Sequence, residues 1–148
     1  MYKGKVLVVE DNDLNRKLMR GIFKVGNYQM IEAVDAETGI DLAREHLPFL
    51  ILMDIQLPGM DGLTATKVIK TDPELRDIPV VALTGFAMQG DEEKALEAGC
   101  EGYITKPVGV QNVLDTINEF HQKSAHKQGI PNRYDQGSGN GLTEQGGS

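Results

Sequence analysis

Five short apolar runs recur along the chain, and this rhythm constrains the fold more than any other feature. The runs occupy residues 5–9, 29–34, 49–53, 79–83 and 102–104. Their starts lie roughly 20 to 30 residues apart, the length of one strand plus one crossover helix, so the pattern predicts five strand–helix units. Several runs are apolar at successive positions, which is typical of parallel strands covered by helices on both faces.

The segments between the runs carry the spacing of amphipathic helices. In the first segment, Leu14, Leu18 and Ile22 recur at every fourth residue and predict the buried face of a helix. Asp13 is its expected N-cap and Gly26 its expected stop. Further helices are expected at residues 36–47, 62–72, 88–98 and 110–120. The fourth is the most weakly patterned, because residues 89–94 are polar all round.

Five such units in a row predict an α/β fold with a doubly wound parallel sheet, in strand order 2-1-3-4-5. This pattern covers residues 1–123, which we expect to form one domain. Residues 124–148 are rich in glycine and have almost no apolar periodicity. We expect them to form a flexible tail or linker.

The charge of the chain lies almost entirely in its body. The net charge is −7, and the charged residues beyond position 123 balance one another. An acidic body repels phosphate backbones, which argues against direct nucleic-acid binding. No apolar run is long enough for a membrane span or the core of a signal peptide. With a single cysteine, Cys100, the simplest expectation is a cytoplasmic protein.

Polar side chains stand at the ends of four of the predicted strands. Glu10 and Asp11 follow the first strand, and Asp54 follows the third. Thr84 follows the fourth, and Lys106 comes two residues after the fifth. The carboxyl ends of parallel strands share one edge of the sheet, where open α/β folds place their sites. In the predicted order, strands one and three are neighbours, so we expect the three carboxylates to meet.

Three carboxylates in one pocket need a counter-charge. Two unit charges about 4 Å apart repel by about 4 kcal/mol at an effective dielectric constant of about 20. A hard divalent cation relieves this repulsion, and an all-oxygen site that is open to solvent suits Mg²⁺. Lys106 adds a point charge for phosphoryl oxygens, and Thr84 adds a hydroxyl donor. The group therefore has what phosphoryl transfer to a carboxylate requires.

The residues around these positions resemble the receiver domain of bacterial two-component response regulators. The resemblance rests on VLVVEDND (6–13), LILMDIQLPGMDG (50–62), VVALTG (80–85) and GYITKP (102–107). It covers about residues 3–123 and is most similar to DivK-like single-domain regulators and to the receivers of hybrid histidine kinases. It implies a flavodoxin-like (βα)5 fold and a role in phosphorelay signal transduction.

The resemblance also implies the acceptor and the metal site. Asp54 would accept a phosphoryl group from a phosphohistidine of a histidine kinase or a histidine phosphotransfer protein. Glu10, Asp11, Asp54 and the backbone carbonyl of Gln56 would hold Mg²⁺. No enzymatic activity is implied beyond self-phosphotransfer and slow autodephosphorylation.

The remaining roles implied by the resemblance concern switching. Thr84 and Lys106 would contact the bound phosphoryl group, and Tyr103 would turn inward when Thr84 moves. Gly85 matches the small residue that leaves the site open, and Pro107 matches a cis-proline position. A protein partner would read the resulting change on the face formed by the fourth helix, the fifth strand and the fifth helix.

Other interpretations remain to be separated from this one. A free-standing regulator is favoured because Met1 lies only a few residues before the first strand, but a receiver excised from a hybrid kinase or a larger response regulator is the alternative. A flavodoxin-like cofactor binder is disfavoured because residues 10–13 are acidic where a phosphate-binding loop is needed. A dehalogenase-type phosphatase is disfavoured by Gln56, where a second aspartate is expected.

Overall fold

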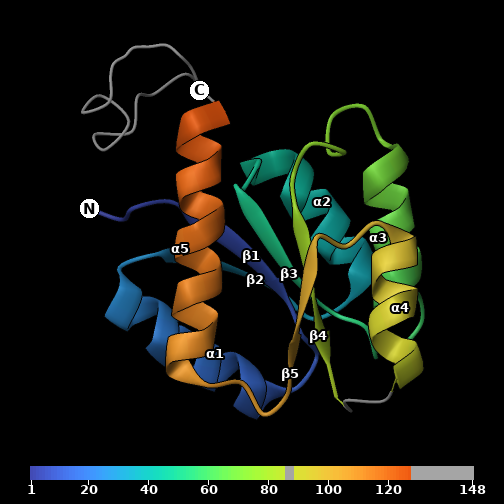
Figure 1. The fold of residues 1–148 in the computed structure, drawn as a ribbon, viewed down its shortest axis with the longest axis horizontal. Coiled ribbons are helices and arrows are strands. Elements are labelled where there is room, and N and C mark those ends of the chain that lie inside the picture. Colours follow the sequence, from blue (N-terminus) through green and yellow to red (C-terminus); the bar gives the residue numbers. More distant parts are fainter. Residues whose placement is uncertain (86–88, 128–148) are drawn as a thin grey trace.

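The computed structural model of the chain describes residues 1–85 and 89–127, in which strands and helices alternate (Figure 1). The strands are β1 (Lys5–Val9), β2 (Gln29–Ala33), β3 (Leu50–Asp54), β4 (Val80–Thr84) and β5 (Gly102–Thr105). The helices are α1 (Asp13–Gly26), α2 (Ala36–His46), α3 (Gly62–Thr71), α4 (Gln89–Ala98) and α5 (Val110–Lys127). All neighbouring strands are parallel, and their order is β2-β1-β3-β4-β5. The predicted fold class and strand order are confirmed.

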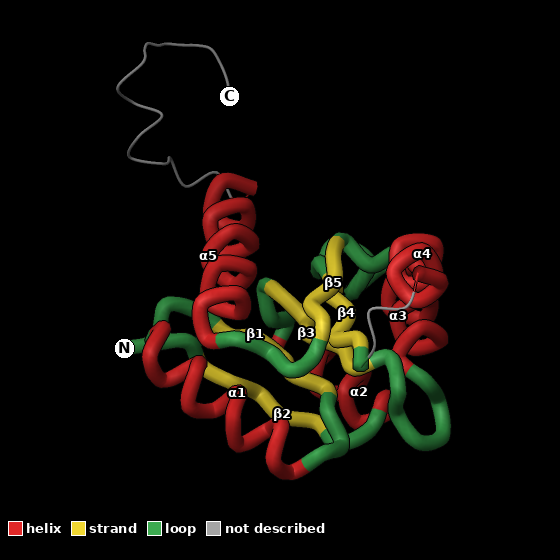
Figure 2. The backbone as a smooth tube through the Cα atoms, turned by 60° about the horizontal axis from the view of Figure 1, so that its bottom comes forward, coloured by secondary structure: helices red, strands yellow, loops and turns green. Residues whose placement is uncertain are grey.

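The sheet lies between two layers of helices, as Figure 2 shows. Alternate residues of each strand face opposite layers, because successive side chains of a strand point to opposite faces. Leu7 and Val9 belong to the cluster that packs with α2, α3 and α4, whereas Val6 and Val8 belong to the cluster that packs with α1 and α5. The central strands β3 and β4 are buried at every residue, which explains their almost unbroken apolar sequences, whereas the edge strands β2 and β5 are only partly buried.

Helix α1 differs from its prediction in two respects. Its N-cap is Asn12, whose side chain accepts a hydrogen bond from the backbone N–H of Asn15, and Asp13 is the first helical residue. Leu14 and Leu18 are 75% and 43% exposed, so the predicted buried face is wrong at both positions. The residues of α1 that are buried are Arg16, Met19, Ile22 and Phe23.

The other helices agree better with the sequence pattern. Asp35 and Asp61, which stand directly before the second and third predicted helices, cap α2 and α3, and Gly99, with a positive φ of 107°, follows α4. The expected start of the fourth helix, Met88, lies outside the described residues. Helix α5 continues to Lys127, past residue 124, where the sequence predicts the tail to begin. None of the helices in the described part of the chain has an apolar stretch that could cross a membrane.

Candidate functional site

The pairing of β1 with β3 brings three carboxylates together at the carboxyl edge of the sheet. Val9 pairs with Met53 in this parallel ladder. The next residue on each side is an acid, Glu10 after β1 and Asp54 at the end of β3. Oxygen atoms of Glu10, Asp11 and Asp54 all lie within 4.8 Å of one another. The structure thus brings together the three acids that the sequence places at this edge.

The three carboxylates differ in their exposure to solvent. Glu10 is 1% and Asp54 is 3% exposed, whereas Asp11 is exposed. The Asp54 carboxylate accepts a hydrogen bond of 2.9 Å from the backbone N–H of Gln56, which fixes one of its oxygens. The cluster is therefore open to solvent on the side of Asp11.

Lys106 supplies the positive charge of the site. Its Nζ lies 2.6 Å from Oε1 of Glu10 and 3.0 Å from Oδ2 of Asp54. Burial disfavours the ammonium charge, but hydrogen bonds to the two carboxylates outweigh it, so the pKa of Lys106 is raised above its usual value. The backbone N–H of Lys106 donates to the Thr84 carbonyl, and the peptide bond to Pro107 is cis. One ammonium group thus bridges two acids.

Thr84 brings a hydroxyl to the same edge from the end of β4. The residue is fully buried, and its Oγ1 has no hydrogen-bond partner among the described residues. Leaving a buried hydroxyl unpaired costs about 1–3 kcal/mol. This hydroxyl is therefore a donor with unused capacity beside the acids and Lys106.

Replacing Thr84 by valine, which has the same shape, is expected to raise the free energy of unfolding by about 1 kcal/mol, because it removes the unpaired hydroxyl. Thr66 is the matched control, since it is equally buried but its Oγ1 donates to the Gly62 carbonyl at 2.7 Å. Thr66→Val is expected to lower stability by about the same amount. Urea unfolding of both variants measures the difference. A loss of stability in Thr84→Val would contradict the assignment of an unpaired hydroxyl.

The side chains of Tyr103 and Gln56, together with Gly85, make none of the contacts to the acids described above. The side chain of Tyr103 is 42% exposed, and the nearby Glu92 carboxylate of α4 raises its pKa. It is therefore in an outward orientation. A Cβ atom added at Gly85 would lie 3.1 Å from Oε1 of Gln56, so these two residues face each other at the rim.

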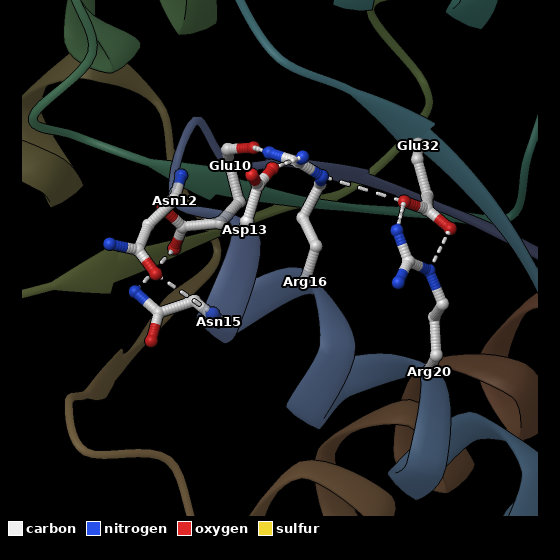
Figure 3. A network of polar contacts seen from close by, with 7 residues as sticks. All are labelled: Glu10, Asn12, Asp13, Asn15, Arg16, Arg20 and Glu32. Carbon is white, nitrogen blue, oxygen red and sulfur yellow. Dashed lines mark hydrogen bonds and ion pairs between the residues drawn. The ribbon is translucent and has the colours of Figure 1, made fainter.

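The sequence pattern missed two residues that contact Glu10. Asn15 donates from its side-chain amide to the Glu10 carboxylate at 3.3 Å, and Arg16 donates to the Glu10 carbonyl at 2.9 Å (Figure 3). Their positions on α1, five and six residues after Glu10, allow both to reach back to the end of β1. This spacing is the one signal that could have indicated them.

The donor set fits Mg²⁺. Hard carboxylate and carbonyl oxygens are the ligands that this ion takes in proteins, and it usually keeps several waters. The close carboxylates of Glu10, Asp11 and Asp54 meet the first requirement, and the exposure of Asp11 meets the second. The unpaired Thr84 hydroxyl and the Lys106 ammonium suit an anionic group bound next to the ion.

The family model, the related proteins and the solved structures that match this chain all point to one family. A model of the response regulator receiver domain matches residues 6–118. The polar-differentiation response regulator DivK of Brucella anthropi is 51% identical over 115 residues, which cover 78% of this chain and 94% of that protein. Among solved structures, the receiver domain of a sensor histidine kinase from Pseudomonas aeruginosa, with a magnesium ion coordinated in its active site cleft, is 30% identical with a TM-score of 0.75. The match covers 80% of this chain and 98% of that one.

A second solved structure shows the same fold. The signal receiver domain of a signal transduction histidine kinase from Syntrophus aciditrophicus is 26% identical with a TM-score of 0.77. The match covers 88% of this chain and 98% of that one.

Proposed function

Because this chain belongs to the response regulator receiver domain family and is DivK-like, we propose that it accepts a phosphoryl group on Asp54 and passes the signal on through protein contacts. The observation that carries the proposal is the bridge from Lys106 to the carboxylates of Asp54 and Glu10, beside Asp11. It combines a nucleophile, a cation and an acidic pair at one edge. These are the parts that phosphoryl transfer to a carboxylate needs.

In the proposed reaction, Asp54 is the nucleophile. The carboxylate oxygen that contacts Lys106 attacks the phosphorus atom of a phosphohistidine, the new O–P bond forms, and the N–P bond breaks with its electron pair returning to the imidazole. The Gln56 N–H holds the other oxygen, which orients the attacking one. Lys106 is placed to neutralise the oxygens of the transferred group. The donor would be a histidine kinase or a histidine phosphotransfer protein.

Mg²⁺ is the cofactor proposed for this site. Glu10, Asp11, Asp54 and the Gln56 backbone carbonyl would hold it, and it would supply charge neutralisation for the phosphoryl oxygens. The clustered carboxylates support this set, and the Pseudomonas relative described with magnesium in its cleft supports the choice of ion.

Phosphorylation would change the surface formed by α4, β5 and α5 through Thr84 and Tyr103. A phosphoryl group adds about −1.5 to −2 charges and strong acceptor oxygens, which the unpaired Thr84 hydroxyl can reach by moving. The space it leaves would admit the outward-facing Tyr103, and the surface of α4, β5 and α5 would change for a downstream protein target. To shift the ratio of two conformations from 1:99 to 99:1, phosphorylation would have to favour one of them by about 5.5 kcal/mol.

The direct test is incubation with acetyl phosphate, with and without Mg²⁺, followed by intact mass measurement. We expect one added phosphoryl group, about 80 Da, only when Mg²⁺ is present. Bound flavin in the purified protein would instead favour a cofactor binder.

Mg²⁺ is expected to raise the melting temperature of the chain, because a ligand that binds only the folded state stabilises it by mass action. At a concentration 100 times its dissociation constant the gain is about 2.7 kcal/mol. Asp11→Asn is expected to remove most of this gain, since it takes one charge from the carboxylate cluster. Thermal melting with increasing Mg²⁺ measures the effect, and Asp41→Asn, an exposed acid of α2, is the control. An equal gain in Asp11→Asn would show that Asp11 is no part of the metal site.

A further inference from the structure

Glu10 is the most completely enclosed acid of the site, and its contacts come from three directions. One carboxylate oxygen accepts from the backbone N–H of Asn12 at 3.1 Å. The other accepts from the side-chain amide of Asn15 at 3.3 Å and lies 2.6 Å from Lys106 Nζ. With 1% of its surface exposed, Glu10 relies on protein donors in place of water.

One of these donors is shared with another acid, and the other two donate to Glu10. Lys106 is shared with Asp54, from which it lies 3.0 Å away. An anionic group attached to Asp54 would also attract the ammonium group of Lys106, which would weaken the interaction of Lys106 with Glu10. Among the described residues, the Asn12 N–H and the Asn15 amide donate to no other carboxylate of this cluster. The backbone N–H is fixed by the chain, so the Asn15 amide is the side chain that continues to orient the carboxylate.

The main chain of Glu10 is held separately. Arg16, 9% exposed, donates from Nη1 to the Glu10 carbonyl at 2.9 Å. Its guanidinium also contacts Asp13 and lies 3.5 Å from Glu32 on β2, which is bound by two hydrogen bonds from Arg20 (Figure 3). The backbone of Glu10 is therefore anchored whatever stands at position 15, and a change of Asn15 acts on the carboxylate alone.

We propose that Asn15 is a positioning residue for the metal site and acts through the Glu10 carboxylate. Side chains that hydrogen-bond metal ligands orient them, and their loss typically lowers metal affinity by 10- to 100-fold. Asn15 donates over a long distance of 3.3 Å, so we place its effect at about tenfold, the low end of that range. This inference rests on the proposed function, because it assumes that Glu10 helps to hold Mg²⁺.

The test is calorimetric titration of the full chain and its Asn15→Ala variant with Mg²⁺. We expect the dissociation constant of the variant to rise by about tenfold. The backbone N–H of residue 15 keeps its bond to the Asn12 cap, and the higher helix propensity of alanine offsets the lost hydrogen bond to Glu10, so stability without Mg²⁺ should be nearly unchanged. A purely structural role predicts the opposite result, a less stable variant with the same affinity.

Two more variants complete the design. Asn15→Leu keeps the branched shape of the side chain but has no donor, and it is expected to weaken Mg²⁺ binding as alanine does. Asn112→Ala changes an exposed asparagine of α5 and is expected to bind Mg²⁺ as the unaltered chain does. Phosphorylation by acetyl phosphate should need more Mg²⁺ for half its maximal rate in the Asn15 variants and reach the same maximum.

The outcomes separate this inference from the function on which it rests. Absence of Mg²⁺ binding by the unaltered chain overturns the proposed metal site as a whole. Binding by the unaltered chain with equal affinity in Asn15→Ala and Asn15→Leu overturns the role of Asn15 alone.

Discussion

Asp54→Asn is expected to abolish phosphorylation by acetyl phosphate, so that the variant keeps its mass while the unaltered chain gains about 80 Da. The substitution keeps the shape of the side chain but replaces the nucleophilic oxygen by an amide nitrogen, which does not form the acyl phosphate. It also removes one negative charge from beside Lys106 and Glu10, so the variant should fold. Intact mass after a fixed incubation with Mg²⁺ gives the result.

Asp61→Asn is the control for the same loop. Asp61 is exposed and caps α3 through the N–H of Thr64, and asparagine caps helices equally well. This variant should be phosphorylated like the unaltered chain. Mass gain in Asp54→Asn would place the acceptor elsewhere and remove the basis of the proposed function.

The second large effect is expected at Gly62, the first residue of α3. A Cβ atom there would collide with the carbonyl oxygen of Asp54 and come within 2.8 Å of the Cα of Ile55. The colliding atoms belong to the backbone at the end of β3, so no side chain can turn away to make room. Gly62→Ala should therefore lower the free energy of unfolding by roughly 3 kcal/mol, the upper part of the range for overpacking. The melting temperature should fall by on the order of 10 °C.

Gly21→Ala is the matched comparison, since Gly21 lies within α1 and an added Cβ would meet nothing within 4 Å. Alanine is expected to stabilise this helix by about 0.5–1 kcal/mol. If Gly62→Ala lowers the free energy of unfolding and Gly21→Ala raises it, the close approach of α3 to Asp54 causes the loss of stability, and the loss of a glycine alone does not. A stable Gly62→Ala variant would mean that β3 and α3 can separate.

The course of the chain was predictable because its signals are local. The central strands are short apolar runs such as Leu50–Asp54, and α2 and α3 each follow an aspartate that caps them, such as Asp61. The meeting of Glu10 with Asp54 followed from the strand order, because all parallel strands end at one edge.

The orientation of α1 was not predictable, because two apolar stripes overlap on this helix. Leu14, Leu18 and Ile22 suggest one face, but only Ile22 of these is buried, and it is buried together with Met19 and Phe23. Arg16 lies on the buried side of the helix as well and donates to the Glu10 carbonyl. Such a contact depends on tertiary structure, and an arginine in a polar segment gives no sign of it.

The outward orientation of Tyr103 and the unpaired hydroxyl of Thr84 also lay beyond the sequence. Both depend on how the side chains at this edge pack in three dimensions, which no local sequence signal indicates. The contact between Tyr103 and Glu92 joins β5 to α4, the helix with the weakest sequence pattern.

The acidic cluster has a counter-ion of its own, the ammonium group of Lys106. The ammonium group of Lys106 contacts both Glu10 and Asp54, so a metal ion bound at this cluster would compete with it for the same carboxylates. Its affinity would therefore be lower than that of a site with three unpaired acids. Without a metal ion, Lys106 relieves the repulsion between the carboxylates of Glu10 and Asp54 and so helps to keep these two acids together.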